Sequence, residues 1–251
     1  MVAHPPRLGA PWYGHQATER LLELLPYFEK EMLTLGTLVP RGGVCLDIGA
    51  AGGTYTYLLS RLVGEEGRVH AFEPRPRSYR FLERSRRLLG LANVSLHQLA
   101  LTESAGVEVM LVPRRGGLSF STRSFLRRGL DPKTGDFYPE FTSTSPLDVV
   151  GTTLDLFAER HRLPRVDFIK CDVEGAELWT LHGGSRTIAT HRPVILCEIE
   201  HRHLAKYELS PAHVREWLIE RGYRSYAFWG GAFREVSEVT PTENNYLFVP
   251  E

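Results

Sequence analysis

The chain has 251 residues, a formal net charge of zero, and 42% hydrophobic and 24% charged residues. This composition is ordinary for a globular protein, and the length accommodates one large α/β domain. The balanced charge excludes a globally basic surface for nucleic acid and a polybasic membrane signal. Arginines gather at residues 75–87, which we interpret as a solvated helix face.

The cysteines and the apolar runs bear on the compartment. Three cysteines lie in apolar segments without metal-site spacing and predict reduced core residues in a cytoplasmic protein: Cys45, Cys171 and Cys197. The first residues lack the apolar region of a secretory signal. No apolar run approaches the ~20 residues of a membrane helix, so we expect no membrane partner.

Residues 1–40 predict an arm rich in Pro and Gly, then one or two helices that could cover a pocket. In the main domain, residues 41–251, strands are predicted at 44–49, 68–74, 94–101, 106–113, 166–173, 193–200, 225–236 and 244–251. Helices are predicted between them at 54–64, 76–91, 152–163, 175–191 and 210–223; in the second of these, the candidate core positions are Phe81, Leu82, Leu88 and Leu89. This alternation predicts an α/β fold with a mostly parallel, doubly wound sheet and helices on both faces. The last two strands follow each other closely and predict an antiparallel hairpin at one edge.

Ligands of open α/β sheets bind outside the carboxyl ends of the strands. At these ends the sequence places an unusual number of acids and one histidine, namely Asp47, Glu73, Asp172, Glu174, Glu198, Glu200 and His201. A buried carboxylate is costly without partners. We therefore expect these side chains to share one site.

The loop after the first strand, VCLDIGAAGGTYTYLL, carries glycines that a tight strand-to-helix turn or a nucleotide cradle would both need. Its G-x-x-G-G spacing misses the G-x-G-x-x-G pattern of dinucleotide sites. Asp47 precedes the first glycine by two residues and would repel a pyrophosphate, whereas Glu73 can accept hydrogen bonds from a ribose diol. This combination favours S-adenosylmethionine over a nicotinamide cofactor.

Six segments together resemble the FkbM family of S-adenosylmethionine-dependent methyltransferases: VCLDIGAAGGTYT, VHAFEP, VSLHQLALTES, TTLDLFA, VDFIKCDVEGAEL and PVILCEIE. The resemblance runs from about Val44 to Glu200 with a gap at 114–146, and IKCDVEGAEL is its most specific part. It departs at Ala51, where the family usually has asparagine. The resemblance implies a class I, Rossmann-like methyltransferase fold with seven strands, the last antiparallel. It also implies methylation of a hydroxyl, often on a sugar or a natural product.

The resemblance also implies roles for individual residues. The methionine end of the cofactor would be held by Asp47, Gly49 and Gly53, with Ala50 and Tyr55 nearby. Glu73 would bind the ribose, and the adenine would be bordered by Leu99, Ala100 and Leu101. Asp172 would face the amino group of the cofactor or the substrate.

Methyl transfer to an alcohol also requires a general base. The candidates near the strand ends are Asp172, Glu174, Glu198, Glu200, His201 and His203. Of these we select His201, Asp172 and Glu198, and we favour His201 because a histidine titrates near neutral pH. A surface position for His201 is an equally good interpretation. As an alternative, Asp172, Glu198 and Glu200 could bind Mg²⁺, which would lower the pKa of the substrate hydroxyl.

Residues 114–146 have no clear period and mix aromatic, hydroxyl and arginine side chains. We interpret this insert as a substrate lid, with an oligomer interface as the alternative. The expected partner is a hydroxylated small molecule such as a sugar, glycoside or polyketide. The sequence leaves open whether the protein also forms a homo-oligomer. The competing functions are methylation of nucleic acid or of a nitrogen acceptor, a nicotinamide-dependent oxidoreductase, and a cofactor-binding scaffold without activity.

Overall fold

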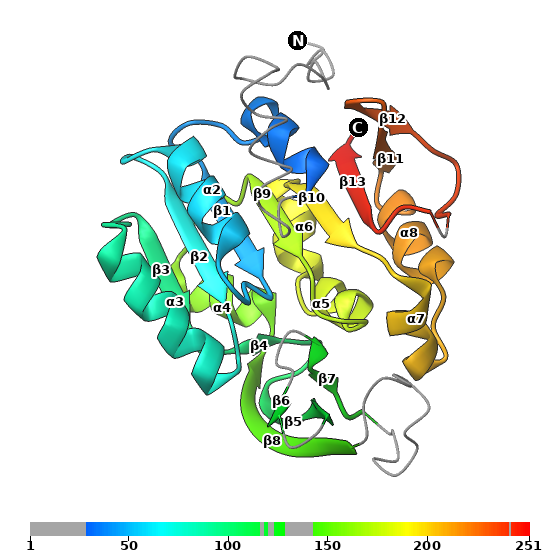
Figure 1. Ribbon diagram of the computed structural model, residues 1–251. Helices are drawn as coiled ribbons and strands as arrows, with labels where there is room; N and C mark the ends of the chain where they lie inside the picture. Colours follow the sequence, from blue (N-terminus) through cyan, green and yellow to red (C-terminus); the bar gives the residue numbers. More distant parts are fainter. Residues whose placement is uncertain (1–28, 116–117, 120–122, 129–142, 241) are drawn as a thin grey trace.

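A computed structural model describes residues 29–115, 118–119, 123–128, 143–240 and 242–251. The arm and most of the helical stretch expected before residue 40 lie outside these ranges; within them, a short 3₁₀ helix, η1 (Lys30–Thr37), is present. The main sheet has the strand order β12-β11-β13-β10-β9-β1-β2-β3 (Figure 1). Its strands are β1 (Val44–Ile48), β2 (Arg68–Phe72), β3 (Val94–His97), β9 (Phe168–Cys171), β10 (Val194–Glu198), β11 (Tyr223–Trp229), β12 (Ala232–Glu235) and β13 (Asn245–Pro250).

The pairing of these strands confirms the expected α/β architecture. Strands β3, β2, β1, β9 and β10 are parallel, whereas β13 is antiparallel to both β10 and β11. There is one strand more than the seven expected, because the segment 225–236 itself forms the hairpin of β11 and β12 around Gly230 and Gly231. The chain passes from β1 to β2 on one side and reaches β9 on the other, so the topological switch point lies between β1 and β9.

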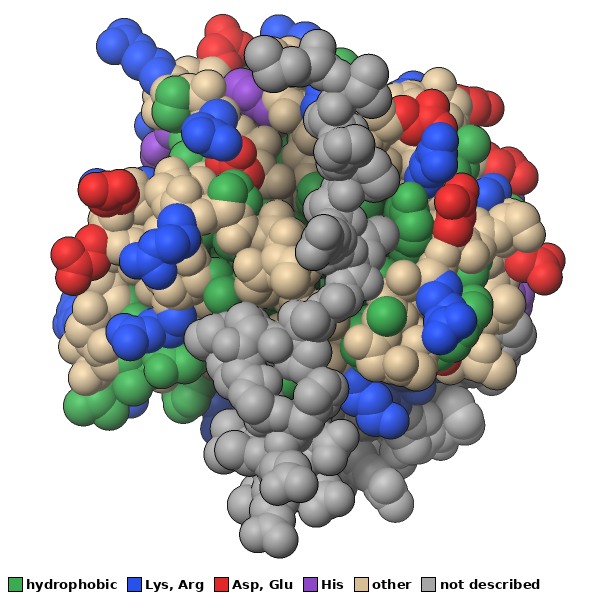
Figure 2. Space-filling view, turned by 90° about the horizontal axis from the view of Figure 1, so that it is seen from above, with side chains coloured by type: hydrophobic (Ala, Val, Ile, Leu, Met, Phe, Trp, Pro, Cys, Tyr) green, Lys and Arg blue, Asp and Glu red, His purple; other side chains and the backbone are tan. Residues whose placement is uncertain are grey.

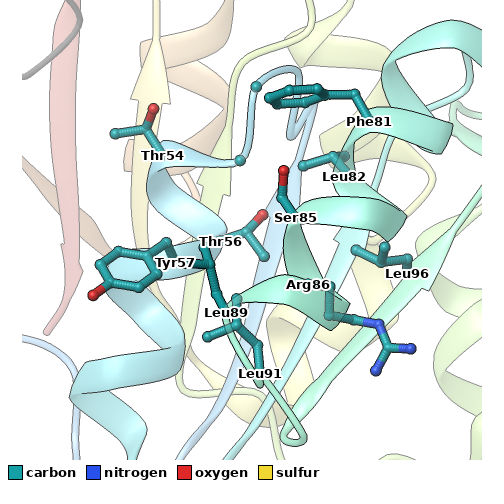
Figure 3. A pocket seen from close by; sticks show the side chains of 12 residues that line it. Thr54, Thr56, Tyr57, Phe81, Leu82, Ser85, Arg86, Leu89, Leu91 and Leu96 are labelled. Atoms are coloured by element: carbon teal, nitrogen blue, oxygen red, sulfur yellow. The ribbon is translucent and has the colours of Figure 1, made fainter.

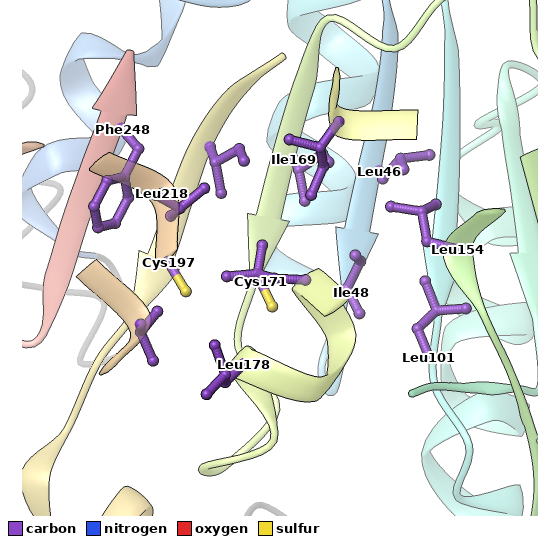
Figure 4. Close-up of a cluster of buried hydrophobic side chains, with 14 of the residues drawn as sticks. Leu46, Ile48, Leu101, Leu154, Ile169, Cys171, Leu178, Cys197, Leu218 and Phe248 are labelled. Atoms are coloured by element: carbon purple, nitrogen blue, oxygen red, sulfur yellow. The ribbon is translucent and has the colours of Figure 1, made fainter. Parts of the chain in front are cut away.

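Helices cover both faces of this sheet. They are α2 (Thr54–Val63), α3 (Pro76–Leu88), α4 (Leu154–His161), α5 (Glu177–His182), α6 (Ser185–His191), α7 (His201–Leu204), η4 (Ala205–Tyr207) and α8 (Pro211–Ile219). Alternate strand residues point to opposite faces. One set packs against α4, α5, α6 and α8 (Figure 4), and the other packs against η1 and α2. The three cysteines are free and buried, as expected.

A second, smaller sheet lies at the carboxyl ends of the parallel strands (Figure 1). It consists of β4 (Ala100–Leu101), β8 (Ser143–Thr152), β5 (Gly106–Arg115) and β6 (Leu118–Ser119), and β7 (Phe125–Leu126) pairs with β5. The expected strand at 94–101 is therefore wrong as one element, because β3 and β4 belong to different sheets. The expected insert begins within β5 and ends within β8; residues 116–117, 120–122 and 129–142 lie outside the described ranges, so the lid stays a prediction.

Candidate cofactor site at the carboxyl ends of the parallel strands

The turn between β1 and α2 is fixed by the sheet. The backbone N–H groups of Gly49 and Ala50 both donate to the carbonyl oxygen of Phe72, at 3.0 and 2.9 Å. Gly49 has a φ of 86°, and a Cβ there would lie 1.8 Å from the carbonyl oxygen of Asp172. Only glycine allows this approach of β1 to the end of β9. The turn thus brings the glycine loop against Asp172.

The other small residues of the turn differ in what they face. A Cβ at Gly53, the residue that precedes α2, would lie 2.5 Å from the side chain of Leu82, and Ala50 is buried. Gly52, by contrast, faces open space, with no heavy atom within 4 Å of its Cβ position among the described residues. Gly52, which sequence reasoning did not select, is thus the glycine of this turn with space around it, and it lines a cavity between α2 and α3. The contacts of Gly53 and Ala50 are packing contacts, and their role toward a cofactor stays a prediction.

Glu73, the expected ribose ligand, directly follows β2 and is 1% exposed. Its Oε2 accepts from the N–H of Ala51 at 2.9 Å and from Nη2 of Arg75 at 2.9 Å. Its Oε1 accepts from the backbone N–H and from Nε of Arg75, at 2.9 and 2.7 Å. Arg75 is itself buried, so it does not belong to the solvated helix face that we expected. Glu73 joins the two loops that follow β1 and β2.

Ala51 has a φ of 44°, in the left-handed region that asparagine tolerates better than alanine. The residue is therefore held in a strained backbone conformation by its neighbours, and its hydrogen bond to Glu73 contributes to this. Asparagine at this position in the family fits the same geometry. The departure at Ala51 thus changes the side chain without changing the course of the turn.

Asp47 lies inside the sheet layer and is 2% exposed. Its carboxylate accepts a hydrogen bond from the hydroxyl of Thr56 on α2. Burial raises the pKa of Asp47 to about 6, although the Thr56 hydroxyl and the Lys170 ammonium lower it. The described contacts of Asp47 are with the protein interior. Its contact with the methionine end of a cofactor stays a prediction.

Lys170 is a buried cation that sequence reasoning missed. It lies opposite Asp47 in the register of the parallel strands β1 and β9, and it is 1% exposed. Its Nζ lies 3.1 Å from Oδ1 of Asn245, 3.5 Å from Oδ2 of Asp172, and 4.9 Å from the ring centre of Tyr55. Burial alone would lower the pKa of Lys170, but the neighbouring carboxylates of Asp172, Glu29 and Glu198 raise it, so the ammonium stays charged. The signal was visible as a lysine within an otherwise apolar strand.

Asp172 and Glu198, which follow β9 and end β10, form a carboxyl pair. Burial, together with the charge of Asp172, raises the pKa of Glu198 well above its usual value. Burial would also raise the pKa of Asp172, but Lys170 and a hydrogen bond with Glu198 hold it below its usual value. The two pKa values are thus shifted in opposite directions, which favours the proton on Glu198 and the charge on Asp172. The side chain of Asp172 is 32% exposed, so its carboxylate remains accessible.

The histidine that approaches these acids is His203, not His201. His201 begins α7 and is exposed, whereas the His203 side chain is 4% exposed. Nε2 of His203 lies 3.1 Å from Oε2 of Glu174, and Nδ1 lies 3.9 Å from Oε2 of Glu198. Two helical positions that are two residues apart point to nearly opposite sides, so only one can face the site. His201 lies on the exposed side of α7, and its role as base stays a prediction.

The pKa of His203 is lowered to about 3, first by burial and then by Lys206 and Arg202. His203 is therefore neutral at pH 7. The acids around it are held in place by the DVEG turn, in which Oε1 of Glu177 accepts from the N–H groups of Val173 and Gly175 at 3.1 and 3.0 Å. The residue that caps this turn is Glu177, whereas Glu174 contacts His203.

The remaining expected residues lie in packing positions. Ala100 is buried with Met110 and Val149 in the second sheet, and Leu99 packs against the main core. Their contact with adenine stays a prediction. Glu200 accepts from Arg202 and, at 2.8 Å, from the side-chain amide of Asn244. Within the described ranges, no group of three or more His, Cys, Asp or Glu residues could hold a metal ion, so the Mg²⁺ alternative has no preformed site there.

A separate cavity of about 220 Å³ lies between α2 and α3 (Figure 3). Its walls include Phe81, Leu82 and Leu89, with Gly52 and Gly53 among its lining residues. Of the core positions expected on α3, only Leu82 is buried; Phe81, Leu88 and Leu89 are exposed. The cavity is on the helical face of the sheet, and the acids at the strand ends do not line it.

The fold and the comparisons define the class of protein. The structure resembles the FkbM methyltransferase of Methylobacillus flagellatus, with a TM-score of 0.50, 16% identity, and coverage of 83% of this chain but only 44% of that one. It also resembles an S-adenosylmethionine-dependent methyltransferase from Aquifex aeolicus, with a TM-score of 0.47, 17% identity, and coverage of 94% and 100%. No curated protein sequence matches significantly. The fold is that of the class I methyltransferases.

The family follows from the sequence comparison. The family model for the methyltransferase FkbM domain matches residues 47–225, which is most of the chain. The chain therefore belongs to the FkbM methyltransferase domain family. Among the residues that the structure describes, no helix is long and apolar enough to cross a membrane.

Proposed function

We propose that this methyltransferase acts on a hydroxyl oxygen of a small molecule, a sugar, a glycoside or a polyketide-type natural product. The observation that supports this is the carboxyl pair, because an alcohol must lose its proton during attack on the methyl group. Asp172 is ionised, accessible and in contact with the glycine turn through its backbone. The raised pKa of Glu198 favours its protonated form, and the Lys170 ammonium favours the charged form of Asp172.

The residues present fit a sulfonium cofactor at this edge. Gly52 has open space around its Cβ position, Asp172 offers a negative charge, and Glu73 directly follows the neighbouring strand β2. In this proposal the glycine turn and Glu73 hold the cofactor, which supplies the electrophilic methyl group. Asp172 accepts the hydroxyl proton, and the alignment of the two reactants contributes the rest of the rate enhancement. His203, neutral at pH 7, helps to hold the acids in position.

The test is methyl transfer to a panel of hydroxylated sugars, glycosides and polyketides, with calorimetry of S-adenosylhomocysteine binding. We expect Asp172→Asn to lower kcat by about 10²–10⁴-fold, the usual contribution of a general base, while the protein still binds S-adenosylhomocysteine. His201→Ala is the matched control for His203→Ala, and only the latter should lower activity. Full turnover in Asp172→Asn, or a loss in His201→Ala alone, contradicts this assignment.

The proposal includes the partners and the location. We propose a small-molecule acceptor rather than nucleic acid or a membrane, because the formal net charge of the chain is zero. Acidic and basic side chains are also interspersed over the face seen in Figure 2, which lies opposite the carboxyl ends of the parallel strands. Three free, buried cysteines are compatible with a reducing compartment, which supports action in the cytoplasm. Methylation of an oligonucleotide in the same panel, with no small molecule accepted, would overturn the choice of acceptor.

A further inference from the structure

The feature that the proposed mechanism leaves unexplained is the saturation of Glu73. A carboxylate has about four acceptor positions. Glu73 uses all four within the protein: one for Ala51, one for the backbone of Arg75, and two for its guanidinium. The side chain is 1% exposed. A ribose diol therefore finds no free acceptor on Glu73 in this arrangement.

The backbone N–H groups of Ala51 and Arg75 and the guanidinium group of Arg75 differ in how easily they can move away from Glu73. Arg75 stands between Pro74 and Pro76, and its φ of −78° and ψ of 124° match the extended conformation that a following proline favours. Its carbonyl oxygen accepts from the N–H of Tyr79 at 2.9 Å, which ties it to α3. The backbone is thus fixed, and only the side chain can turn away from Glu73.

The guanidinium of Arg75 is incompletely satisfied where it lies. Nε and Nη2 bind Glu73, but Nη1 is buried and has no hydrogen-bond partner among the described residues. A buried donor without a partner is unfavourable. Turning the side chain outward would return Nη1 to water, and this offsets part of the loss of the two bonds to Glu73.

We propose that Arg75, in this arrangement, occupies the acceptor positions of the ribose subsite and must be displaced when the cofactor binds. The inference rests on the proposed role of Glu73 in holding the ribose. In the exchange, the N–H···O bonds from Nε and Nη2 are replaced by O–H···O bonds from the two ribose hydroxyls. The bonds from the backbones of Ala51 and Arg75 remain and keep Glu73 in place. Arg75 is then a residue that sets cofactor affinity and favours ligands with both hydroxyls.

The experiment measures binding of S-adenosylhomocysteine by calorimetry, without turnover. Arg75→Met keeps the stem and removes the donors, and we expect about tenfold tighter binding because two hydrogen bonds to a charged group no longer compete. Arg77→Met, exposed on the same helix, removes the same charge and should change the affinity by less than about twofold. Arg75→Lys, which keeps a cation but not the guanidinium geometry, should lie between the wild type and Arg75→Met.

Glu73→Gln separates this inference from the proposed function. If Arg75 acts through Glu73, Arg75→Met should bring no gain in the Glu73→Gln background. The inference is overturned by unchanged or weaker binding of folded Arg75→Met, by a gain equal to that of Arg77→Met, or by a gain that persists in the Glu73→Gln background. Failure of the wild type to bind S-adenosylhomocysteine contradicts the proposed function instead.

Discussion

Replacing Lys170 by methionine tests the charge arrangement at the centre of the site. Methionine keeps an apolar stem of similar length but removes the ammonium that lies 3.5 Å from Asp172 and 3.1 Å from Asn245. Removing one partner of a fully buried ion pair costs about 3–5 kcal/mol. Because the Asp172 side chain is 32% exposed, water screens part of this effect. We expect Lys170→Met to lower the free energy of unfolding by about 2–3 kcal/mol at pH 7.5.

The penalty should depend on pH with a defined sign. In the wild type the pKa of Asp172 is held below its usual value, so its stabilising contribution is present at neutral pH and is lost as the pH falls. Without Lys170, burial would raise the pKa of Asp172, and stability would instead be lost as the pH rises through that value. The difference between wild type and variant is therefore largest at neutral pH and smallest near pH 4.

The assay is urea denaturation followed by circular dichroism at pH 4.5, 6.0 and 7.5. Asp172→Asn in the Lys170→Met background serves as the control, because it removes the unpaired charge and should restore part of the stability. A penalty that is equal at all three pH values, or that the second substitution does not reduce, would refute the assigned charge state of the pair.

Three further results are expected. Gly49→Ala should lower the free energy of unfolding by about 3 kcal/mol or more in urea denaturation, because φ is positive there and the new Cβ would meet the Asp172 carbonyl oxygen. Gly52→Ala, where the Cβ has open space, should change the free energy of unfolding by less than about 0.5 kcal/mol. Equal effects of the two substitutions would contradict the close approach at Gly49. Burial raises the pKa of Glu177 to about 7, so the wild type loses stability as the pH rises from about 4.5 to 7. Between pH 5 and pH 8 the free energy of unfolding of Glu177→Gln should therefore rise relative to that of the wild type by up to about 3 kcal/mol. A difference in urea midpoints that stays constant with pH would contradict this. EDTA should leave methyl transfer unchanged, because Glu200 is already bound by Arg202 and Asn244, and a loss that Mg²⁺ restores would favour the metal alternative.

Much of the fold could be predicted from local patterns. The alternation of strand and helix periods indicated the layers, and the Ser210–Pro211 pair marked the start of α8. The segment 94–101 shows where a local pattern fails. Its apolar residues form an acceptable single strand, but β3 pairs with β2 and β4 pairs with β8, and pairing partners far away in the chain are invisible to a local window.

The candidate site was predictable in position but not in its charge arrangement. Acids that follow parallel strands necessarily gather at one edge, so Asp172 and Glu198 were found from the strand pattern alone. Which of His201 and His203 faces them depends on the start and rotation of α7, which the contact with neighbouring elements decides. The burial of Arg75 likewise follows from its fold-back onto Glu73 between two prolines, although the arginine-rich segment favoured a solvated helix.

The sequence by itself determined the family, the α/β class and the edge of the sheet that carries the candidate site, because these depend on periodicity and on motifs that are continuous in the chain. Only the tertiary structure decided that Lys170 lowers the pKa of Asp172, that burial and Asp172 raise the pKa of Glu198, and that Arg75 fills the acceptor positions of Glu73. Each of these depends on burial and on distances between side chains from different strands and loops, since burial and neighbouring charge are what shift a pKa.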